Sequence, residues 1–316
     1  MDVRLTDGTA VSVKGTVVHE GRPVSGARVW LLHTPGIPVR GFGDVDLAST
    51  VTGANGSFAF AGVAQGQYLV SAGSAAGQAM FGRAVVPVQR DDVTNVVVPM
   101  AAGSRVSGRV EFDGPDAPSG QYLFTWSVRF TPARNQGEVG GLWEHLDERG
   151  AFASRRPPGR YWLEPSGLDA GGTRWLLRSI MGQGRDLTNT PLDLGEDDID
   201  DVVLTVTRRV ATLSGNVTTT AGTEADATVV LLPEHALAAG MRSPYHRPRQ
   251  VLTSGRGAFD FGSLAPGSYF VAAIDDRDAR IVESERYWTS VVRVATRVTL
   301  GDSGHQTVTL PVLRIQ

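Results

Sequence analysis

The stretch that decides the fold is TGANGSFAF at residues 52–60, followed by GQYLV at residues 66–70. Gly56 closes a turn that needs a positive φ, which a residue without Cβ adopts freely. Phe58 and Phe60 follow with the period of a β-strand and therefore point to one face. Tyr68 opens the next strand with its ring directed at the core. The stretch therefore predicts a strand–turn–strand unit of an all-β fold.

The same unit occurs three times in the chain of 316 residues. The second copy is DERGAF at 147–152 with PGRYWL at 158–163, and the third is TSGRGAFDF at 253–261 with PGSYFV at 266–271. The two glycines of each copy are 10, 9 and 10 residues apart (56 to 66, 150 to 159, 257 to 267). A further glycine lies in a β-branched strand 41, 42 and 42 residues before each turn glycine (15 to 56, 108 to 150, 215 to 257). This agreement predicts three tandem domains of one kind.

Valine-rich strands close the three copies, at residues 93–98, 202–206 and 308–313. We therefore expect a rod of three tandem antiparallel β-sandwich domains at residues 1–101, 102–208 and 209–316. The middle copy is diverged, with an insertion-like segment around residues 134–143. In its first part, Phe124, Trp126, Val128 and Phe130 alternate as if on one face of a strand. Helix is scarce, and the best candidate is a short piece around residues 283–291.

Composition narrows the function classes. The hydrophobic content of 41% supports real cores, and 38 Gly and 17 Pro spread along the chain suit many short strands. A formal net charge of −3 gives no electrostatic reason to expect nucleic acid. The absence of Cys excludes disulfides, thiolate metal sites and cysteine nucleophiles. No apolar run approaches the roughly 18–20 residues that span a bilayer, so no membrane insertion is expected.

The first copy also carries a family resemblance. The sequence GRPVSGARV at residues 21–29 follows the strand that holds Gly15 and precedes the two turns quoted above. This order resembles the carboxypeptidase regulatory-like domain, a transthyretin-like (prealbumin-like) sandwich close to Cna-B and starch-binding-like domains. The third copy matches from residue 215 to 311, whereas the second lacks the PVSGA stretch and resembles the family through its turns and spacing.

The resemblance implies a non-catalytic bacterial module in tandem array, with no catalytic residue and no cofactor. We expect a spacer, adhesive or regulatory region whose partner is a protein or a surface polysaccharide. The family implies an extracytoplasmic place: periplasmic, cell-surface or secreted. Residues from Met1 onward show no charged segment followed by an apolar one, so the export signal would lie outside this sequence. The alternative, taken from the sequence as it stands, is a cytoplasmic protein.

Aromatic residues outside the strand alternation suggest an alternative function. The candidate carbohydrate-binding residues are Trp143, Trp175, Tyr245 and Trp288. Aromatic rings of this kind can stack on the apolar face of a pyranose. The same rings could instead pack inside or between domains. Three exposed, near-coplanar rings would favour the sugar interpretation.

Two patterns resemble metal sites. His145 and Glu148 have the H-x-x-E form of zinc carboxypeptidases, and His246 is a third possible ligand. The repeat aligns this motif with strand ends before turns, so we interpret His145 as a surface residue and a zinc carboxypeptidase as the less favoured alternative. The acidic run at residues 196–201 lacks the order of a calcium loop and precedes a valine strand, where a solvated turn is expected. Calcium binding by such loops stays open.

Overall fold

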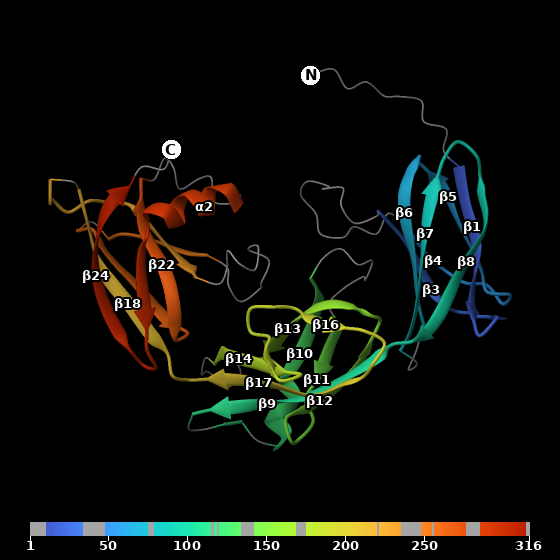
Figure 1. Cartoon of the computed structure of the whole chain (residues 1–316), viewed down its shortest axis with the longest axis horizontal. Helices are drawn as coiled ribbons and strands as arrows, with labels where there is room; N and C mark the ends of the chain where they lie inside the picture. The colour runs from blue at the N-terminus through green and yellow to red at the C-terminus, as the bar shows by residue number, and fades with distance from the viewer. Residues whose placement is uncertain are drawn as a thin grey trace.

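The computed structural model describes residues 11–33, 48–74, 79–114, 117–118, 120–133, 142–168, 175–219, 221–234, 248–254, 256–275 and 285–313. These residues form β-strands and turns, with one α-helix and one 3-10 helix among the described parts. The predicted all-β fold is therefore confirmed. The described strands pair in three sets, which we call the first, second and third units (Figure 1).

The first unit comprises β1 (Val11–His19), β2 (Arg22–Pro23), β3 (Arg28–His33), β4 (Ala48–Val51), β5 (Ser57–Val63), β6 (Gly66–Gly73), β7 (Met80–Val88) and β8 (Val93–Ala102). Strand β1 pairs with β5 and β8, β3 lies between β4 and β6, and β7 joins β6 to β8. Phe58 and Phe60 are buried in the core between these layers, as the strand period predicts.

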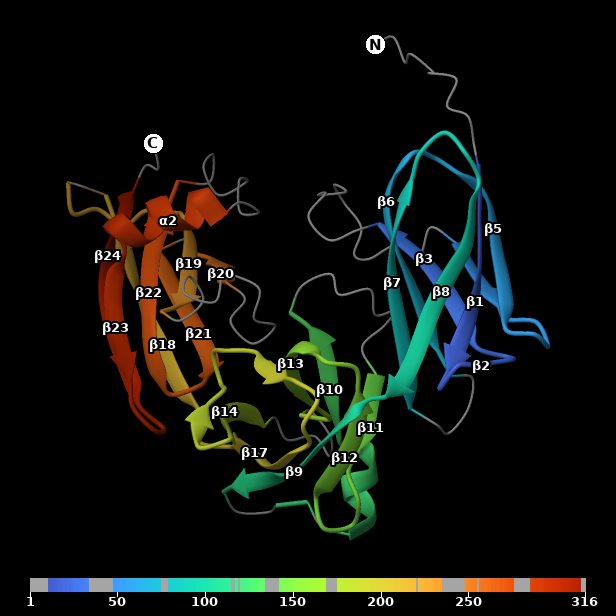
Figure 2. The ribbon, with the colours of Figure 1, turned by 45° about the vertical axis from the view of Figure 1, so that its right-hand side comes forward.

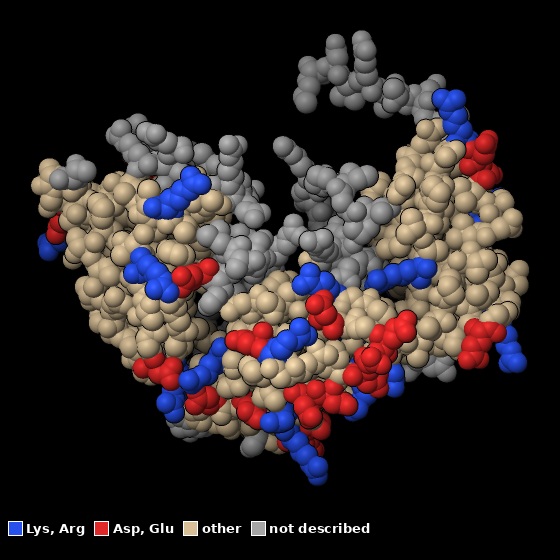
Figure 3. Space-filling model, viewed as in Figure 1, with Lys and Arg blue, Asp and Glu red and all other residues tan. Residues whose placement is uncertain are grey.

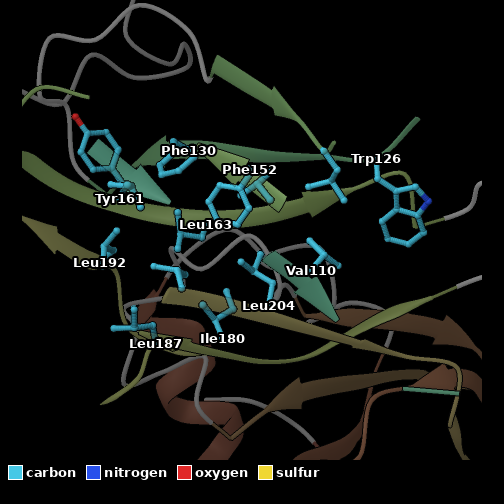
Figure 4. Packing of buried hydrophobic residues seen from close by; sticks show 14 of the residues in the cluster. Val110, Trp126, Phe130, Phe152, Tyr161, Leu163, Ile180, Leu187, Leu192 and Leu204 are labelled. Atoms are coloured by element: carbon cyan, nitrogen blue, oxygen red, sulfur yellow. The ribbon is translucent and has the colours of Figure 1, made fainter. Parts of the chain in front are cut away.

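The second unit comprises β9 (Ser104–Asp113), the 3-10 helix η1 (Gly120–Thr125), β10 (Ser127–Pro132), β11 (Leu142–His145), β12 (Ala151–Arg156), β13 (Gly159–Ser166), β14 (Leu176–Gly182), β15 (Arg185–Asp186), β16 (Leu192–Leu194) and β17 (Ile199–Thr207). Its two sheets have the orders β12-β9-β17-β14-β15 and β11-β10-β13-β16. Figure 4 shows Phe130 and Phe152 facing each other between the sheets, with ring centroids 6.2 Å apart. The diverged copy therefore keeps a closed sandwich core.

The third unit comprises β18 (Ala211–Thr218), β19 (Thr228–Pro233), β20 (Arg249–Leu252), β21 (Ala258–Leu264), β22 (Gly267–Ile274), α2 (Glu285–Val294), β23 (Thr296–Leu300) and β24 (His305–Leu313). Strand β18 pairs with β21 and β24, and β22 lies between β19 and β23. Phe259 and Phe261 are buried as predicted. Helix α2 lies where the sequence suggests a short helix, and its Tyr287 and Trp288 pack in a second cluster outside the main core.

Parallel pairs occur where we predicted only antiparallel ones; β22 and β24 form one in the third unit, and another kind is common to all three units. In every unit the first and last strands are parallel neighbours: β1 with β8, β9 with β17 and β18 with β24. The repeated upstream glycine lies at this contact. A Cβ added to Gly15, Gly108 or Gly215 would lie 2.1, 1.9 or 1.9 Å from the carbonyl oxygen of Val96, Val202 or Val308. Close approach of the last strand therefore requires glycine here.

The turn glycines have the predicted backbone conformation. The φ angles of Gly56, Gly150 and Gly257 are 72°, 78° and 70°. In each copy the glycine carbonyl accepts a hydrogen bond from the valine that lies two residues after the upstream glycine, as in Val110 N–H to Gly150 O at 2.9 Å. The turn and the first strand are thus tied together in the same way three times.

The three units follow a bent path, and the rod that we expected from the repeat is not formed. The first and third units lie on the same side of the second (Figures 1 and 2). The sheet β11-β10-β13-β16 is the layer of the second unit on the inner side of this bend. Strand β8 ends at Ala102, and β17 ends at Thr207. The division into residues 1–101, 102–208 and 209–316 remains our proposal.

Within the described parts of the chain, no helix has the length and apolar character needed to cross a bilayer.

Candidate binding surface

Two of the tryptophans that we assigned to a sugar platform are core residues. Trp175 is 2% exposed and meets Trp126 edge-on, with ring centroids 6.4 Å apart. Trp288 is also 2% exposed, because its side chain on α2 packs against Val230 and Leu232 of β19. Neither ring is available to stack on a ligand, which corrects their assignment. Burial here depends on tertiary neighbours that strand alternation does not reveal.

Trp143 is the candidate that stays at the surface. It lies on β11 and is 48% exposed, even though the guanidinium of Arg129 stands 5.1 Å from its ring centroid. This is the distance of a cation–π contact. The fourth candidate, Tyr245, lies outside the described residues, as does His246.

Two more exposed aromatic residues lie near Trp143, and the sequence did not identify them. Tyr122 and Phe124, in η1, are 65% and 51% exposed. The sequence predicts Phe124 on one face of a strand together with Trp126, but it lies in the 3-10 helix and is exposed. His145 Nδ1 lies 3.1 Å from the carbonyl oxygen of Phe124 and so joins η1 to β11. We call Tyr122, Phe124 and Trp143 the aromatic surface.

The outer face of β10 and β13 carries polar groups beside Trp143. Core residues of these strands, such as Phe130 and Leu163, alternate with four residues that face outward: Arg129, Thr131, Trp162 and Glu164, which we call the polar row. In the strand register Arg129 lies opposite Glu164, and Thr131 lies opposite Trp162. The guanidinium of Arg129 is 4.0 Å from the Glu164 carboxylate and opposite Trp143 on β11.

Three polar atoms of this row are buried without a hydrogen-bond partner: Arg129 Nε, Thr131 Oγ1 and Trp162 Nε1. A buried donor or acceptor left unpaired costs about 1–3 kcal/mol, and native proteins contain few of them. Trp162 is only 5% exposed, although it lies on the opposite face from the core. All three atoms lie at neighbouring positions of one pair of strands.

The H-x-x-E motif forms a turn. The carboxylate of Asp147 accepts hydrogen bonds from the backbone N–H groups of Arg149 and Ala151, both at 2.8 Å. His145 is held by η1 on one side of this turn, and Glu148 is exposed. Among the described residues no three His, Asp or Glu side chains converge as metal ligands.

Carboxylates of the acidic run before β17 accept hydrogen bonds from the neighbouring strand β9. Asp198 Oδ1 accepts the backbone N–H of Arg105 at 2.7 Å, and the carboxylate of Asp200 binds the Ser107 hydroxyl. The first unit repeats the arrangement, with Asp92 Oδ1 accepting the N–H of Ser12 at 2.8 Å. That hydrogen bond lowers the pKa of Asp92 below its ordinary value. These carboxylates are therefore used to fix the start of the first strand.

A cleft of about 440 Å³ lies between the second and third units. It is lined by Leu177 and Asn189 on one side and by Leu264 and Tyr269 on the other. Arg178 spans the junction, binding Asp113 of its own unit and Asp302 of the third unit, the latter at 3.2 Å. Burial opposes ionisation of Asp113, but hydrogen bonds from Arg178 and Thr207 hold its pKa below the usual value. The cleft is therefore bounded by an ion-pair junction.

Charge is mixed over the visible face of the molecule. Figure 3 shows acidic side chains gathered over the second unit, with basic side chains interspersed among them. Among the described residues of this face there is no broad basic stripe of the kind that binds nucleic acid.

Comparison with known proteins identifies the first unit. Residues 12–101 match the family model described as Carboxypeptidase regulatory-like domain, which confirms the resemblance seen in the first copy. The match covers the first unit and leaves the second and third units unmatched. A search of curated proteins found no match.

Several solved structures are distantly similar. A streptococcal ancillary pilin is 10% identical, covering 96% of this chain and 98% of that chain, with a TM-score of 0.31. The minor pilin GBS52 of Streptococcus agalactiae is 14% identical, covering 66% and 94%, with a TM-score of 0.31. The TIE protein of Bacillus anthracis is 12% identical, and this chain covers 51% of that chain with a TM-score of 0.24. At such scores the similarity gives no information about what this chain binds.

Proposed function

We propose that this chain is a non-catalytic, extracytoplasmic interaction module, in which three sandwich domains hold a binding surface on the middle one. The observation that carries the proposal is that the three units share a fold but differ in their exposed aromatic side chains. The second unit keeps the strand pairing and the closed core of its neighbours, yet the three large aromatic side chains exposed among the described residues all lie on it. Exposed apolar groups concentrated in one place are typical of interaction sites.

The family of the first unit supports the non-catalytic and extracytoplasmic parts of this proposal. The resemblance to this family implies a spacer or regulatory module that has no catalytic residue of its own. In this chain, polar side chains that could be mistaken for a site, such as Asp147 and Asp198, are engaged in turns and strand ends.

The test is binding of the labelled full chain to intact cells and cell-wall preparations of the source organism. Replacing Tyr122, Phe124 and Trp143 together by Ser should abolish retention. The matched control replaces Val51, Val85 and Leu252 by Ser, because these side chains are as exposed but lie on the other two units. Retention that is equal for both triple variants, or absent for the wild type, would refute the proposal. Protection of the native protein from external protease in spheroplasts, whose cytoplasmic membrane is intact, would refute the extracytoplasmic place.

Carbohydrate binding is the second candidate, and one observation favours it. Trp143 presents a half-exposed indole beside the Arg129–Glu164 pair, so an apolar plane and charged hydrogen-bonding groups lie side by side. A saccharide needs both kinds of contact, whereas Trp175 and Trp288 contribute neither because they are buried.

A further inference from the structure

In the first unit, the start of β7 has a strand partner at both of its edges. Phe81 pairs with Ala101 of β8 on one side and with Gly73 of β6 on the other. Gly82, the next residue, likewise lies between β8 and β6. The backbone of this segment is therefore part of a ladder on each side.

The strand of the second unit that takes the place of β7 is β14. Five residues after the valine that pairs with the upstream glycine lie Ala101 in β8 and Thr207 in β17 (96 to 101, 202 to 207), so these two residues are equivalent. Ala101 pairs with Phe81. Thr207 pairs with Leu176, so Leu176 lies where the first unit has Phe81.

One edge of β14 lacks the partner that its counterpart has. Strand β13, the counterpart of β6, pairs with β10 and β16, whereas β14 pairs with β17 and β15. Strand β15 reaches only Met181 and Gly182. Among the described strands, none pairs with residues 176–179 on the side away from β17. We call this segment the open edge.

The open edge faces the cleft between the second and third units. At one end the Trp175 N–H binds the Leu168 carbonyl at 2.7 Å, and at the other the Ile180 N–H binds the Thr188 hydroxyl at 2.8 Å. Leu168 and Thr188 line the cleft together with residues 176–179. None of the described residues of β17 or β9 lines it. The cleft therefore runs along the edge of β14, on the side away from β17.

The cleft is accessible and has apolar walls. Leu176 and Leu177 line it from β14, and Ala265 and Pro266 line it from the turn before β22. All four residues are partly exposed. The volume of about 440 Å³ falls in the range of roughly 300–1,000 Å³ that is typical of ligand sites, which favour domain interfaces. The open edge can therefore be reached from solvent.

A β-bulge within the open edge links it to the third unit. The strand register shifts between Leu177 and Ser179, so Arg178 is the extra residue. A bulge of this kind re-aims a side chain and is common at sheet edges. The Arg178 guanidinium binds the Asp302 carboxylate of the third unit at 3.2 Å. This ion pair joins the two walls of the cleft at its rim.

We propose that the open edge binds an extended peptide segment of a partner protein, which adds to the sheet as an antiparallel strand. The first unit supplies the template, because β6 lies antiparallel to β7 at the equivalent edge. Backbone N–H and C=O groups of the segment pair with those of β14, which provides affinity, and its alternate side chains provide specificity. These side chains are apolar, because they pack among Leu177, Leu264 and Pro266.

This inference goes beyond the proposed function, because it concerns a different place on the chain. None of Tyr122, Phe124 and Trp143 lines the cleft. The triple Ser variant of the aromatic surface should therefore bind a strand peptide like the wild type, although it should lose retention on cells. The two proposals can fail separately.

The test is isothermal titration calorimetry of the whole chain with two synthetic peptides. One has the sequence YLVSAG of residues 68–73, which includes the β6 segment that pairs with the start of β7. The other is the general strand former VTVTVT. Both carry lysine at each end for solubility. We expect saturable binding of at least one of them to the wild type.

Backbone methylation distinguishes strand addition from simple apolar contact. N-methylation of alternate residues removes the N–H groups of one edge of the peptide, and methylation of the intervening residues removes those of the other edge. Only one edge pairs with β14, so the affinities of the two methylated copies should differ at least about tenfold, which corresponds to 1.4 kcal/mol. Equal affinities would overturn the proposal.

A matched pair of protein variants locates the binding. Ala265→Trp fills the cleft from the third unit and should weaken peptide binding at least about tenfold. Ala64→Trp is the control, because Ala64 lies on the equivalent turn of the first unit, where its carbonyl accepts the same tyrosine hydrogen bond. Both variants should melt like the wild type, and Ala64→Trp should keep full affinity.

Hydrogen exchange gives a direct readout of the edge that is used. The bound peptide should slow amide exchange in the fragment that contains Leu176–Ser179. Protection at another strand edge would overturn the proposal, as would no binding of either peptide or equal affinities of Ala265→Trp and Ala64→Trp. Self-association of the wild type that Ala265→Trp abolishes would identify a second copy as the occupant, and would refute a partner protein.

Discussion

The hydroxyl of Tyr161 donates a hydrogen bond to the backbone carbonyl of Pro157, four residues earlier, at 2.8 Å. This bond closes the turn that leads into β13, and the Tyr161 ring packs against Phe130 in the core of the second unit. The other units contain the same bond, from Tyr68 to Ala64 at 2.9 Å and from Tyr269 to Ala265 at 2.6 Å. The repeated tyrosine therefore joins each core to the turn before it.

Loss of this hydroxyl should destabilise the second unit. Tyr161→Phe keeps the ring and leaves the Pro157 carbonyl without this donor, so the free energy of unfolding should fall by about 1 kcal/mol. Urea unfolding followed by circular dichroism measures the change. Tyr122→Phe is the control, because Tyr122 is exposed and its variant should unfold like the wild type. Equal stability of Tyr161→Phe and the wild type would contradict the prediction.

The phenol of Tyr269 should titrate far above the ordinary range. Burial raises its pKa from 10.0 to about 12, and the nearby Arg249 only partly opposes the shift. Because the folded protein favours the neutral phenol, this group stabilises the fold fully below pH 10 and loses that effect as the pH rises through 12. Absorbance at the tyrosinate wavelength measures the titration, and Tyr269→Phe should remove a step near pH 12. A step that survives in the variant would refute the assignment.

The upstream glycine should tolerate no side chain. In Gly215→Ala the new Cβ would meet the Val308 carbonyl oxygen at 1.9 Å, so β18 and β24 must separate. We expect a loss of about 3 kcal/mol or more, at the upper end of overpacking effects. Gly301→Ala is the matched control in the same unit, since nothing lies within 4 Å of its Cβ and its φ is ordinary, and it should be nearly neutral. Thermal unfolding compares the two variants, and similar melting temperatures would exclude the steric explanation.

The buried ion pair of the second unit should be sensitive to loss of one partner. Arg156 is almost fully buried, with its guanidinium 2.9 Å from the Glu144 carboxylate and 5.0 Å from the Phe130 ring centroid. Glu144→Ala leaves this cation without its carboxylate and should cost about 3 kcal/mol. The exposed pair of Arg160 and Asp193 supplies the control, because Asp193→Ala should cost under about 1 kcal/mol. Chemical denaturation that ranks the two variants in the opposite order would contradict this prediction.

The sequence predicted the part of the fold that depends on short-range chemistry. Turn glycines such as Gly56 need a positive φ, and Phe58 and Phe60 follow with strand period, so turns and inward faces could be derived without a structure. The parallel contact between β1 and β8 could not, because it joins strands about 80 residues apart. The sequence therefore shows that a glycine recurs at the position of Gly15, but only the structure shows that the Val96 carbonyl leaves no room for a Cβ there.

The candidate site was predicted less well. Trp143 was identified because it falls outside strand alternation, but the same criterion also selected Trp175 and Trp288, which tertiary packing buries. Phe124 was misplaced because a 3-10 helix interrupts what resembles strand alternation. The polar row needed the register of β10 with β13, since only the pairing shows that Thr131 and Trp162 are neighbours.

The parallel contact between the first and last strand of each unit has a mechanical consequence. In such a pair, tension applied through the chain enters one strand at its start and leaves the other at its opposite end. The pull then runs along the strands, and the ladder hydrogen bonds between β1 and β8 or between β18 and β24 are sheared together instead of being opened one by one. Each unit should therefore resist stretching by force spectroscopy more strongly than a sandwich whose terminal strands form a hairpin.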